Sequence, residues 1–546
     1  MKAYARISCS PMFLVGTLML CVITGTAQSQ PSPQMTARQA SRFAVSAPMR
    51  DLAGLPPQMQ YGFQEVDQIR KPGAMPTQYM YDPVQQDFPG HSAATIVPGL
   101  SVEGINDICL CAPPDTNASV GDTQIVEWVN EDFAVYDKST GALLLGPLPG
   151  NSLFTNLGGD CATQDNADPI AQFDKTAHRW LMAVNLLLRP PYAACVAVST
   201  SPDATGTYYL YQFPLNGYPD YPKWGIWPTG YFQTQNTGGL SSANVCAYNS
   251  TKMLVGDSTA EQICEQLSSS DFSLMPADLD SATQPPVGQD EFFIGSYNQD
   301  SSFNHLYLYS MHPVFSNPSE TVFIGNGLAD PITVPTYTPI CNASYGLCIT
   351  QPGTGRTLEA LGDRLMYRLA YWEDQPLVNV RATPPRPLPS QHWFVNHIVA
   401  GSSGQVAERW YEFTAPIKKV DLTGVSLFQS GTFAPDNNNR WMGSIARDKV
   451  GNVALGYSIG SASMYASIAV AGRSPGDPLG QLGGEVQLTT GTGAQTGLAG
   501  RWGDYSDMVV DPGNPCILWY LQEYLTTTGS ADWQTRMNQI RFSSCQ

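Results

Sequence analysis

Acidic and basic side chains occupy corresponding places in several similar segments of this sequence, each directly before a short apolar run. Two carboxyl groups, one protonated and one ionised, are what the hydrolysis of a glycosidic bond requires. Arginine can instead hold a carboxylate ligand, because its planar fork donates two parallel hydrogen bonds. Candidate catalytic residues are Asp363, Asp504 and Tyr505. The candidate ligand-binding residues are Asp220, Lys223, Arg364, Arg440 and Arg501.

The aspartates form a set that could act together. If the segments converge, Asp115 and Asp168 would join Asp220, Asp363 and Asp504 in a ring of carboxylates. A structural role is the alternative, in which each Asp accepts hydrogen bonds from turn N–H groups where its strand begins. Two carboxyl groups facing each other across an open pocket would favour a hydrolase. Full use of these carboxylates by N–H groups would favour a binding protein or a scaffold.

Oxygen-rich loops suggest one cofactor, Ca²⁺. The segments 165–168 and 436–439 are rich in Asp and Asn, and Ca²⁺ takes six to eight oxygen ligands. Neither segment has the spacing of an EF-hand. The candidate metal ligands are Asp165, Asp168 and Asp436.

The segments that carry these residues recur along the chain. Their separation of roughly 50–80 residues is typical of sheet units that must stack to bury their faces. Short apolar runs bounded by turn residues, such as 206–213, 305–312 and 466–472, predict β-strands. Helical patterns are scarce and short, as at 260–267.

These patterns predict an all-β fold over residues 101–546. A β-propeller accommodates so many short strands, with four strands in each blade. We predict seven blades, and six or eight blades or two packed β domains divided at 384–389 are the alternatives. The seven blades are placed near 112–160, 165–215, 219–275, 290–340, 358–415, 436–495 and 500–546.

The N-terminus predicts export. Lys2 and Arg6 precede an apolar run at 12–23, and small residues follow. At about 12 residues the run is too short to cross a bilayer, so we predict a cleavable signal peptide over 1–27 and a secreted protein without a membrane span. Residues 28–100, rich in Pro and Gln, are predicted to form a flexible leader that can pack against the main body.

The charge of the chain limits its partners. The formal net charge is −18, and loss of the signal peptide would remove two bases and no acids. Nucleic acid and anionic membranes need a positive surface, so we exclude both as partners. An extracellular small molecule or a glycan remains compatible, and we expect a monomer.

Twelve cysteines are present, and two of them fall in the predicted signal peptide. An even number remains, as expected for an oxidising compartment. Cys109 and Cys111 are separated by one residue, and because a bond between them would be strained we expect them to be free or redox-labile. Proximity pairs the others as Cys161–Cys195, Cys246–Cys264, Cys341–Cys348 and Cys516–Cys545.

Two resemblances support the propeller. Residues 201–208, SPDATGTY, resemble the Asp-box hairpin turn of sialidase-like propellers, with one extra residue before the Gly and Tyr in place of Trp. The resemblance implies a turn-forming role for Asp203. Segments from 109 to 546, including PPDTNASVG, DYPKWGIWP, LGDRLMYRLAY, NRWMGSIARD and RWGDYSDMVVDP, resemble a family of large secreted bacterial proteins described as uncharacterised or sialidase-like. That resemblance implies a propeller fold and no established activity.

A true sialidase is not expected. Its three arginines, tyrosine nucleophile and aspartate could come from Arg364, Arg440, Arg501, Tyr505 and Asp504, but the Arg-Ile-Pro motif of that family is not evident after the signal peptide. The sequence therefore predicts a secreted propeller that binds an extracellular ligand, such as a glycan, at the face of its channel. A carbohydrate-active hydrolase that uses two channel carboxylates and a structural surface protein are the alternatives.

Overall fold

The computed structural model describes residues 35–52, 64–65, 76, 78–165, 168–238, 242–268, 271–296, 302–325, 331–341, 346–374, 390–497, 500–530 and 532–546. Within these ranges the chain is all-β, as predicted. It has one short α-helix, α1 (Ser250–Met253), and 3₁₀ turns at Met49–Leu52, Gly150–Phe154, Gly159–Ala162, Pro318–Glu320 and Leu422–Gly424. The predicted signal peptide lies outside the described residues.

Consecutive antiparallel strands form the sheets of the N-terminal half. The first sheet contains β7 (Asn117–Val120), β8 (Gln124–Val129), β9 (Asp132–Asp137) and β10 (Leu143–Pro149). The second contains β11 (Ile170–Asp174), β12 (Arg179–Asn185), β13 (Ala193–Ser199), β14 (Tyr208–Pro214) and β2 (Arg42–Val45). The third contains β15 (Tyr218–Trp227), β16 (Gly230–Gly238), β17 (Ser242–Tyr248), β18 (Glu261–Gln266) and β1 (Thr36–Gln39).

A ten-stranded sheet follows, in which two runs of strands are joined by parallel pairing of β19 with β26. One run contains β19 (Met275–Leu279), β20 (Glu291–Gly295), β21 (His305–His312), β22 (Val322–Ile324) and β23 (Pro331–Thr333). The other contains β26 (Leu369–Glu373), β27 (Ser390–Ala400), β28 (Val406–Pro416), β29 (Ser426–Phe433) and β4 (Gln85–Gln86).

Two four-stranded sheets complete the chain. They contain β30 (Asn439–Arg447), β31 (Val453–Ser461), β32 (Met464–Arg473) and β33 (Gly483–Thr489), then β34 (Asp507–Val510), β35 (Ile517–Leu525), β36 (Trp533–Phe542) and β5 (Ile96–Asn106). Two short pairs lie outside them, β24 (Leu347–Thr350) with β25 (Thr357–Glu359) and β3 (Gln64–Glu65) with β6 (Cys111–Ala112).

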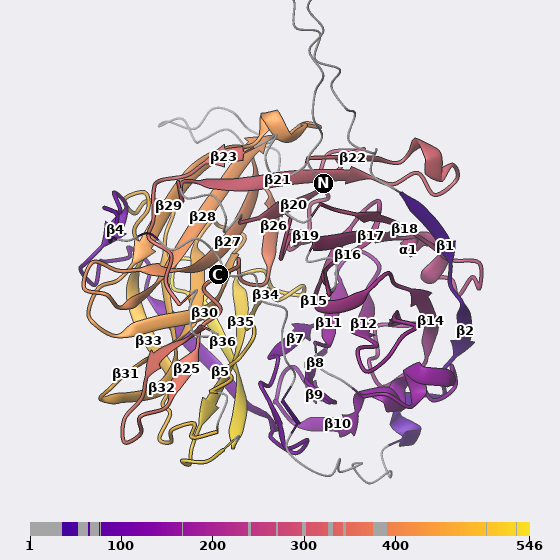
Figure 1. Cartoon of the computed structure of the whole chain (residues 1–546), viewed down its shortest axis with the longest axis horizontal. Helices are drawn as coiled ribbons and strands as arrows, with labels where there is room; N and C mark the ends of the chain where they lie inside the picture. Colours follow the sequence, from indigo (N-terminus) through magenta and orange to yellow (C-terminus); the bar gives the residue numbers. More distant parts are fainter. Residues whose placement is uncertain are drawn as a thin grey trace, which may run out of the picture.

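The first strands of successive runs form a closed ring. β7 contacts β11, the contacts continue through β15, β19, β26, β30 and β34, and β34 contacts β7. Figure 1 shows the N-terminal sheets, indigo to magenta, on one side of this ring and the C-terminal sheets, orange to yellow, on the other. Antiparallel sheets arranged radially around a closed ring make a β-propeller. Seven separate blades are not confirmed, because β19 and β26 merge two runs into one sheet.

Strands from the predicted leader add to these sheets. β1 pairs with β18, β2 with β14, and β4 with β29. β5 crosses the predicted boundary at residue 100 and pairs with β36, so an N-terminal strand completes the C-terminal sheet. Pairing of this kind leaves the last sheet with one fewer open edge.

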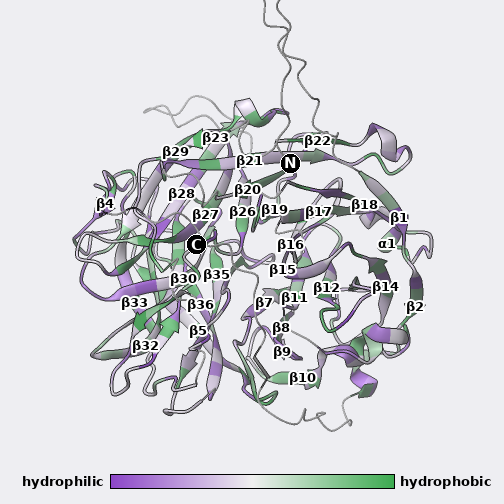
Figure 2. Cartoon of the chain, viewed as in Figure 1, coloured by the Kyte–Doolittle hydropathy of each residue, from purple (hydrophilic) through white to green (hydrophobic). Residues whose placement is uncertain are grey.

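Aromatic and small apolar side chains fill the space between sheets. All residues of β13, AACVAVS, are buried, as expected for a strand covered on both faces. Trp128, Trp180, Trp410 and Trp441 are fully buried. Figure 2 shows hydrophobic and hydrophilic residues interspersed along the strands. Polar residues are found in the protein interior as well as on its surface.

All four predicted disulfides are present: Cys161–Cys195, Cys246–Cys264, Cys341–Cys348 and Cys516–Cys545. Cys109 and Cys111 form a fifth disulfide, so of the two expected states the free one is wrong. Their Cα atoms lie 5.2 Å apart, within the ordinary range for a disulfide, because the chain turns at Leu110. Within the described ranges, no helix has the length and apolar composition needed to cross a membrane.

Candidate functional site

We call the strands that form the closed ring the inner strands. A residue with a left-handed backbone conformation precedes or interrupts most of them. Asp115, Asp168 and Asp504 have φ values of 51°, 65° and 65°, and each stands two or three residues before β7, β11 or β34. Aspartate tolerates this conformation better than most residues. Tyr221, in a bulge of β15, has a φ of 53°. These residues lie at the end of the ring where its strands begin.

Asp115, Asp168 and Asp504 come together there. One carboxylate oxygen of each lies within 4.8 Å of the others, and all three residues are buried. Of the predicted ring of five aspartates, these three have carboxylate oxygens close together, and the other two, Asp220 and Asp363, border the same region.

Neighbouring inner strands are joined through the same aspartates. Asp115 Oδ2 accepts from the N–H of Asp168 at 3.1 Å, and Asp168 Oδ2 accepts from the N–H of Tyr221 at 3.3 Å. Each carboxylate therefore supports the next inner strand rather than its own turn. Their second oxygens, Asp115 Oδ1 and Asp168 Oδ1, are buried and have no hydrogen-bond partner among the described residues.

Burial and crowding change the protonation of this group. Burial, together with Asp504 and Asp168, raises the pKa of Asp115 well above its usual value. Burial raises the pKa of Asp168 to about 6, against the opposing effect of Lys223. Near neutral pH, adjacent carboxyl groups can thus differ in protonation, which is the arrangement that acid–base chemistry uses.

Lys223 is the cation at the centre of the site. Its side chain is fully buried, and its Nζ lies 3.6 Å from the ring centroid of Tyr221 and 3.7 Å from that of Tyr505. Nζ donates to the carbonyl of Pro222 at 3.0 Å. Burial lowers the pKa of Lys223 to about 8, although Asp168 and Asp504 oppose the change. We call Lys223, Tyr221, Tyr505, Asp115, Asp168 and Asp504 the Lys223 cluster.

Three other predicted residues border this cluster. Arg364 lies with its Cζ 4.5 Å from the Tyr221 ring centroid and binds Asp363 through both ends of its fork, at 2.7 and 2.9 Å. Arg501 Nη2 donates to both oxygens of Asp504 at 2.9 Å. Its Nε lies 2.7 Å from Glu359 Oε2.

Asp220 also lies near this group. It is buried in β15 and its charge raises the pKa of Arg364, after the larger effects of burial, which lowers it, and of Asp363 and Tyr221, which raise it. The structure thus brings Asp220, Lys223, Asp363, Arg364, Arg501, Asp504 and Tyr505 into one region.

Arg440 does not join this group. Its side chain is bound by Asp436, at 2.8 and 3.2 Å, and by Glu485, at 2.8 and 2.9 Å. Arg440 lies within β30, two residues before the left-handed Met442, whereas Arg501 stands three residues before Asp504. Arg440 is thus held by Asp436 and Glu485, whereas Arg501, which lies outside any strand, is held by Asp504 and Glu359.

The predicted metal ligands are likewise separated. Asp436 is occupied by Arg440 and by the N–H of Asn438 at 2.8 Å. Asp165 is buried, and its pKa is raised by burial and by the charges of Glu131 and Asp132. Asp168 belongs to the Lys223 cluster. The two predicted loops, 165–168 and 436–439, therefore place these three aspartates in three different surroundings.

The Lys223 cluster fits Ca²⁺ incompletely. Ca²⁺ takes six to eight oxygens, whereas both oxygens of Asp504 accept from Arg501 and one oxygen each of Asp115 and Asp168 accepts an N–H. The positive charges of Lys223 and Arg501 also lie in the same region. Among the described residues this arrangement favours a polar ligand over a metal ion.

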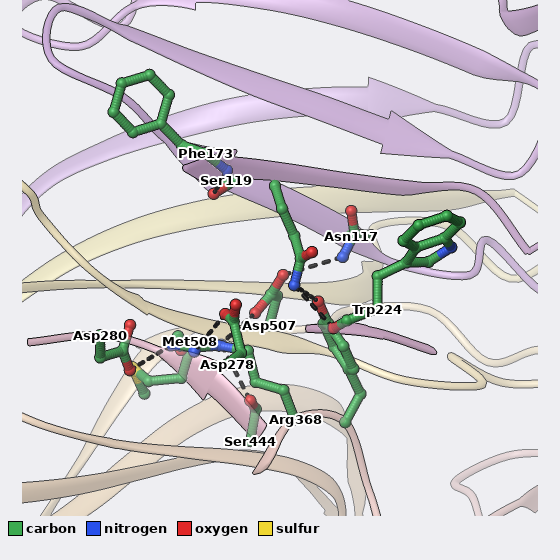
Figure 3. Close-up of polar contacts among 12 residues, drawn as sticks. Asn117, Ser119, Phe173, Trp224, Asp278, Asp280, Arg368, Ser444, Asp507 and Met508 are labelled. Carbon is green, nitrogen blue, oxygen red and sulfur yellow. Dashed lines mark hydrogen bonds and ion pairs between the residues drawn. The ribbon is translucent and has the colours of Figure 1, made fainter. Parts of the chain in front are cut away.

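A second polar network fills the ring beyond the cluster, and the sequence analysis missed it. Figure 3 shows Asp278, Asp280 and Asp507 around Arg368. Arg368 Nη1 lies 2.8 Å from Asp278 Oδ2, and Nη2 donates to the carbonyl of Met508 at 3.0 Å. The sequence feature that indicates this network is Arg368 within the apolar run LMYRLAY, because a buried arginine needs acidic partners.

Three tryptophans near the beginnings of the strands that form the ring are core residues. Trp224, Trp441 and Trp502 are at most 1 % exposed, and Trp502 donates to Ser458 Oγ at 3.1 Å. Asp203, in the Asp-box-like segment, accepts from the N–H of Thr205 at 2.9 Å in the turn between β13 and β14. That segment is therefore a structural turn.

No protein-family model matches the chain, and no curated protein matches it by sequence. Solved structures that resemble it include a subtype N10 neuraminidase-like protein of A/little yellow-shouldered bat/Guatemala/060/2010, with 10% identity over 81% of this chain and 98% of that one and a TM-score of 0.30. The polysaccharide lyase Uly1 has 11% identity, covers 79% and 90%, and has a TM-score of 0.36. The catalytic domain of Coprinopsis cinerea GH62 α-L-arabinofuranosidase has 12% identity, covers 68% and 90%, and has a TM-score of 0.27. At these values the likenesses carry no inference about function.

Proposed function

We propose that this protein is a secreted β-propeller that binds an extracellular glycan through the Lys223 cluster, at the end of the ring where the inner strands begin. One observation carries the proposal: Asp115 and Asp168 each keep a buried oxygen without a hydrogen-bond partner among the described residues. Such an oxygen costs about 1–3 kcal/mol, which a donor from a ligand would recover. Sugar hydroxyls are donors of this kind.

The surroundings of the two oxygens support a neutral, hydroxyl-rich ligand. Lys223 and Arg501 offset part of the negative charge, so a cation gains less than it would at an isolated group of carboxylates. Lys223 Nζ lies over the rings of Tyr221 and Tyr505, so the lysine is held beside the acids. The carboxyl oxygens without a partner are therefore the groups of the cluster left to accept from sugar hydroxyls, which donate.

The test is a glycan array probed with the mature protein and with a double variant, Asp115→Asn with Asp168→Asn. Asn keeps an oxygen for the neighbouring N–H and removes the negative charge, so the inner strands should stay joined. We expect binding by the wild type and its loss in the double variant. Asp421→Asn is the matched control, because Asp421 is exposed and accepts from the N–H of Thr423 in a turn.

A hydrolase is the second candidate, and the raised pKa values of the neighbouring carboxyl groups of Asp115 and Asp168 favour it. Release of reducing sugar from a polysaccharide panel, lost in the same double variant, would support hydrolysis. If neither binding nor hydrolysis is found, the cluster is a structural joint and the protein is a structural surface protein.

A further inference from the structure

A cavity lies away from the Lys223 cluster. It has a volume of about 810 Å³ and is bordered by the ends of β26 and β30, whereas the cluster lies where β7, β11 and β34 begin. Its walls come from distant parts of the chain, between residues 282 and 515. A cavity of this size accommodates a small organic ligand.

The acidic groups of this cavity already have partners. His392 Nδ1 lies 2.7 Å from Glu412 Oε1, and its Nε2 lies 3.1 Å from Asp374 Oδ2. The other oxygen of Asp374 accepts from Arg447 at 2.5 Å. Gln429 donates to the second oxygen of Glu412. Little acceptor capacity remains here for a cationic ligand.

The basic groups, in contrast, have unused donors. Arg473 is 3 % exposed, and the one hydrogen bond that its side chain donates within the described residues goes from Nη2 to the carbonyl of Asp477, at 2.8 Å. The Nε atoms of Arg473 and Arg447 are buried without a hydrogen-bond partner among the described residues. Buried donors are normally satisfied, so two such atoms in one cavity indicate an acceptor that the chain does not provide.

Apolar side chains stand beside these donors. Phe428, Val450 and Leu479 line the cavity and are 49 %, 43 % and 59 % exposed. Trp372 also lines it, with the guanidinium of Arg447 5.7 Å from its ring centroid. Exposed apolar groups gathered at a polar cavity are typical of a surface that a ligand covers.

We propose that this cavity binds a small organic anion, with a carboxylate on Arg473 and Arg447 and an apolar body against Phe428 and Leu479. The guanidinium fork matches a carboxylate in two parallel hydrogen bonds. Lys449, another lining residue, adds positive charge at the rim. The site is independent of the glycan site, because the two share no residue.

Calorimetric titration of the full mature protein tests this site with three probes. Benzoate carries both the carboxylate and an apolar ring, benzyl alcohol carries the ring alone, and sulfate carries the oxyanion alone. We expect saturable binding of benzoate, and binding of the other two that is weaker by about tenfold or more. Equal binding of sulfate would overturn the apolar half of the proposal, and equal binding of benzyl alcohol would overturn the anionic half.

Two variants locate the binding. Arg473→Met removes the guanidinium and keeps an apolar stem, and Leu479→Glu adds a negative charge at an exposed position that folding does not depend on. Both should weaken benzoate binding by about tenfold or more, while Arg541→Met, at an exposed arginine of β36, should not. Absence of benzoate binding, or binding that Leu479→Glu leaves unchanged, would overturn the proposal even if Arg473→Met failed to fold.

Discussion

A buried lysine between two tyrosine rings and three aspartates sets the chemistry of the Lys223 cluster. A lysine without such neighbours would not stay charged in the interior. Here the acids hold the lysine charged, while the lysine keeps the pKa of Asp168 from rising further. The pKa of each group therefore depends on the charges of the others, and a change at one alters the protonation of the rest.

Asp168→Asn should stabilise the protein at neutral pH. The pKa of Asp168 is about 6 in the fold and 3.8 as a reference. A raised folded pKa contributes stability that is fully present below about pH 4 and is lost as the pH rises through 6. We expect the variant to gain about 1–3 kcal/mol in free energy of unfolding at pH 7 and nothing below pH 4.

Chemical denaturation at several pH values from 3.5 to 7.5 checks this expectation. Asp421→Asn should not gain stability as the pH rises, because hydrogen bonds from Thr423 lower the pKa of Asp421 and the loss of this carboxylate acts in the opposite direction. A loss of stability by Asp168→Asn that is the same at every pH would contradict the account, since it would show a purely structural hydrogen bond.

The sequence predicts those features of the cluster that depend on neighbouring residues along the chain. Asp115, Asp168 and Asp504 stand before apolar runs, and the turn chemistry of Asp gives each the same left-handed conformation. Arg440 lies apart from the cluster because Asp436 and Glu485 bind its side chain, and an approximate repeat does not predict these partners. The cavity bordered by β26 and β30 is lined by segments far apart in the chain, and no local pattern predicts that they meet.

At the scale of elements, closure of the ring depends on the last sheet. β36 pairs with β35 on one side and with the N-terminal β5 on the other. The disulfide Cys516–Cys545 joins the turn before β35 to the end of β36, across a sequence separation of 29. The strand patterns predicted these elements and this disulfide, whereas the composition of residues 28–100 gave no sign that β1, β2, β4 and β5 complete sheets formed by later strands.

Replacing both Cys516 and Cys545 with Ser should destabilise this sheet. A loop of this length corresponds to about 3 kcal/mol of lost chain entropy in the unfolded state. We expect the free energy of unfolding to fall by about 2–4 kcal/mol, measured by denaturant titration. The same change at Cys341 and Cys348, which close a separation of only 7, should cost less. An equal or smaller effect at Cys516–Cys545 would contradict its role in closure.

At the scale of the whole molecule, the ring is held by polar as well as apolar contacts. Arg368 with its three aspartates fills the inside of the ring, and the Lys223 cluster lies where the strands begin. Lys223 and Arg501 place positive charge among the three aspartates of the cluster, so a metal ion gains less there than it would from carboxylates alone.

The melting temperature should therefore not respond to calcium. We expect EDTA and added Ca²⁺ each to shift it by no more than about 1 °C, because a ligand that does not bind the native state cannot stabilise it. Scanning calorimetry on the mature protein measures this. A rise with Ca²⁺ that disappears in the Asp115→Asn, Asp168→Asn variant would show that the cluster holds calcium after all.

Binding of a glycan by the Lys223 cluster is the central claim. Its most direct test is calorimetric titration of the strongest glycan from the array into the wild type, the Asp115→Asn, Asp168→Asn variant and the Asp421→Asn control. We predict that the double variant binds about 100-fold more weakly or not at all, since Asn presents an NH2 donor where each carboxyl group presents its unpartnered oxygen, while its melting temperature does not fall. Unchanged affinity in a folded double variant would contradict the claim.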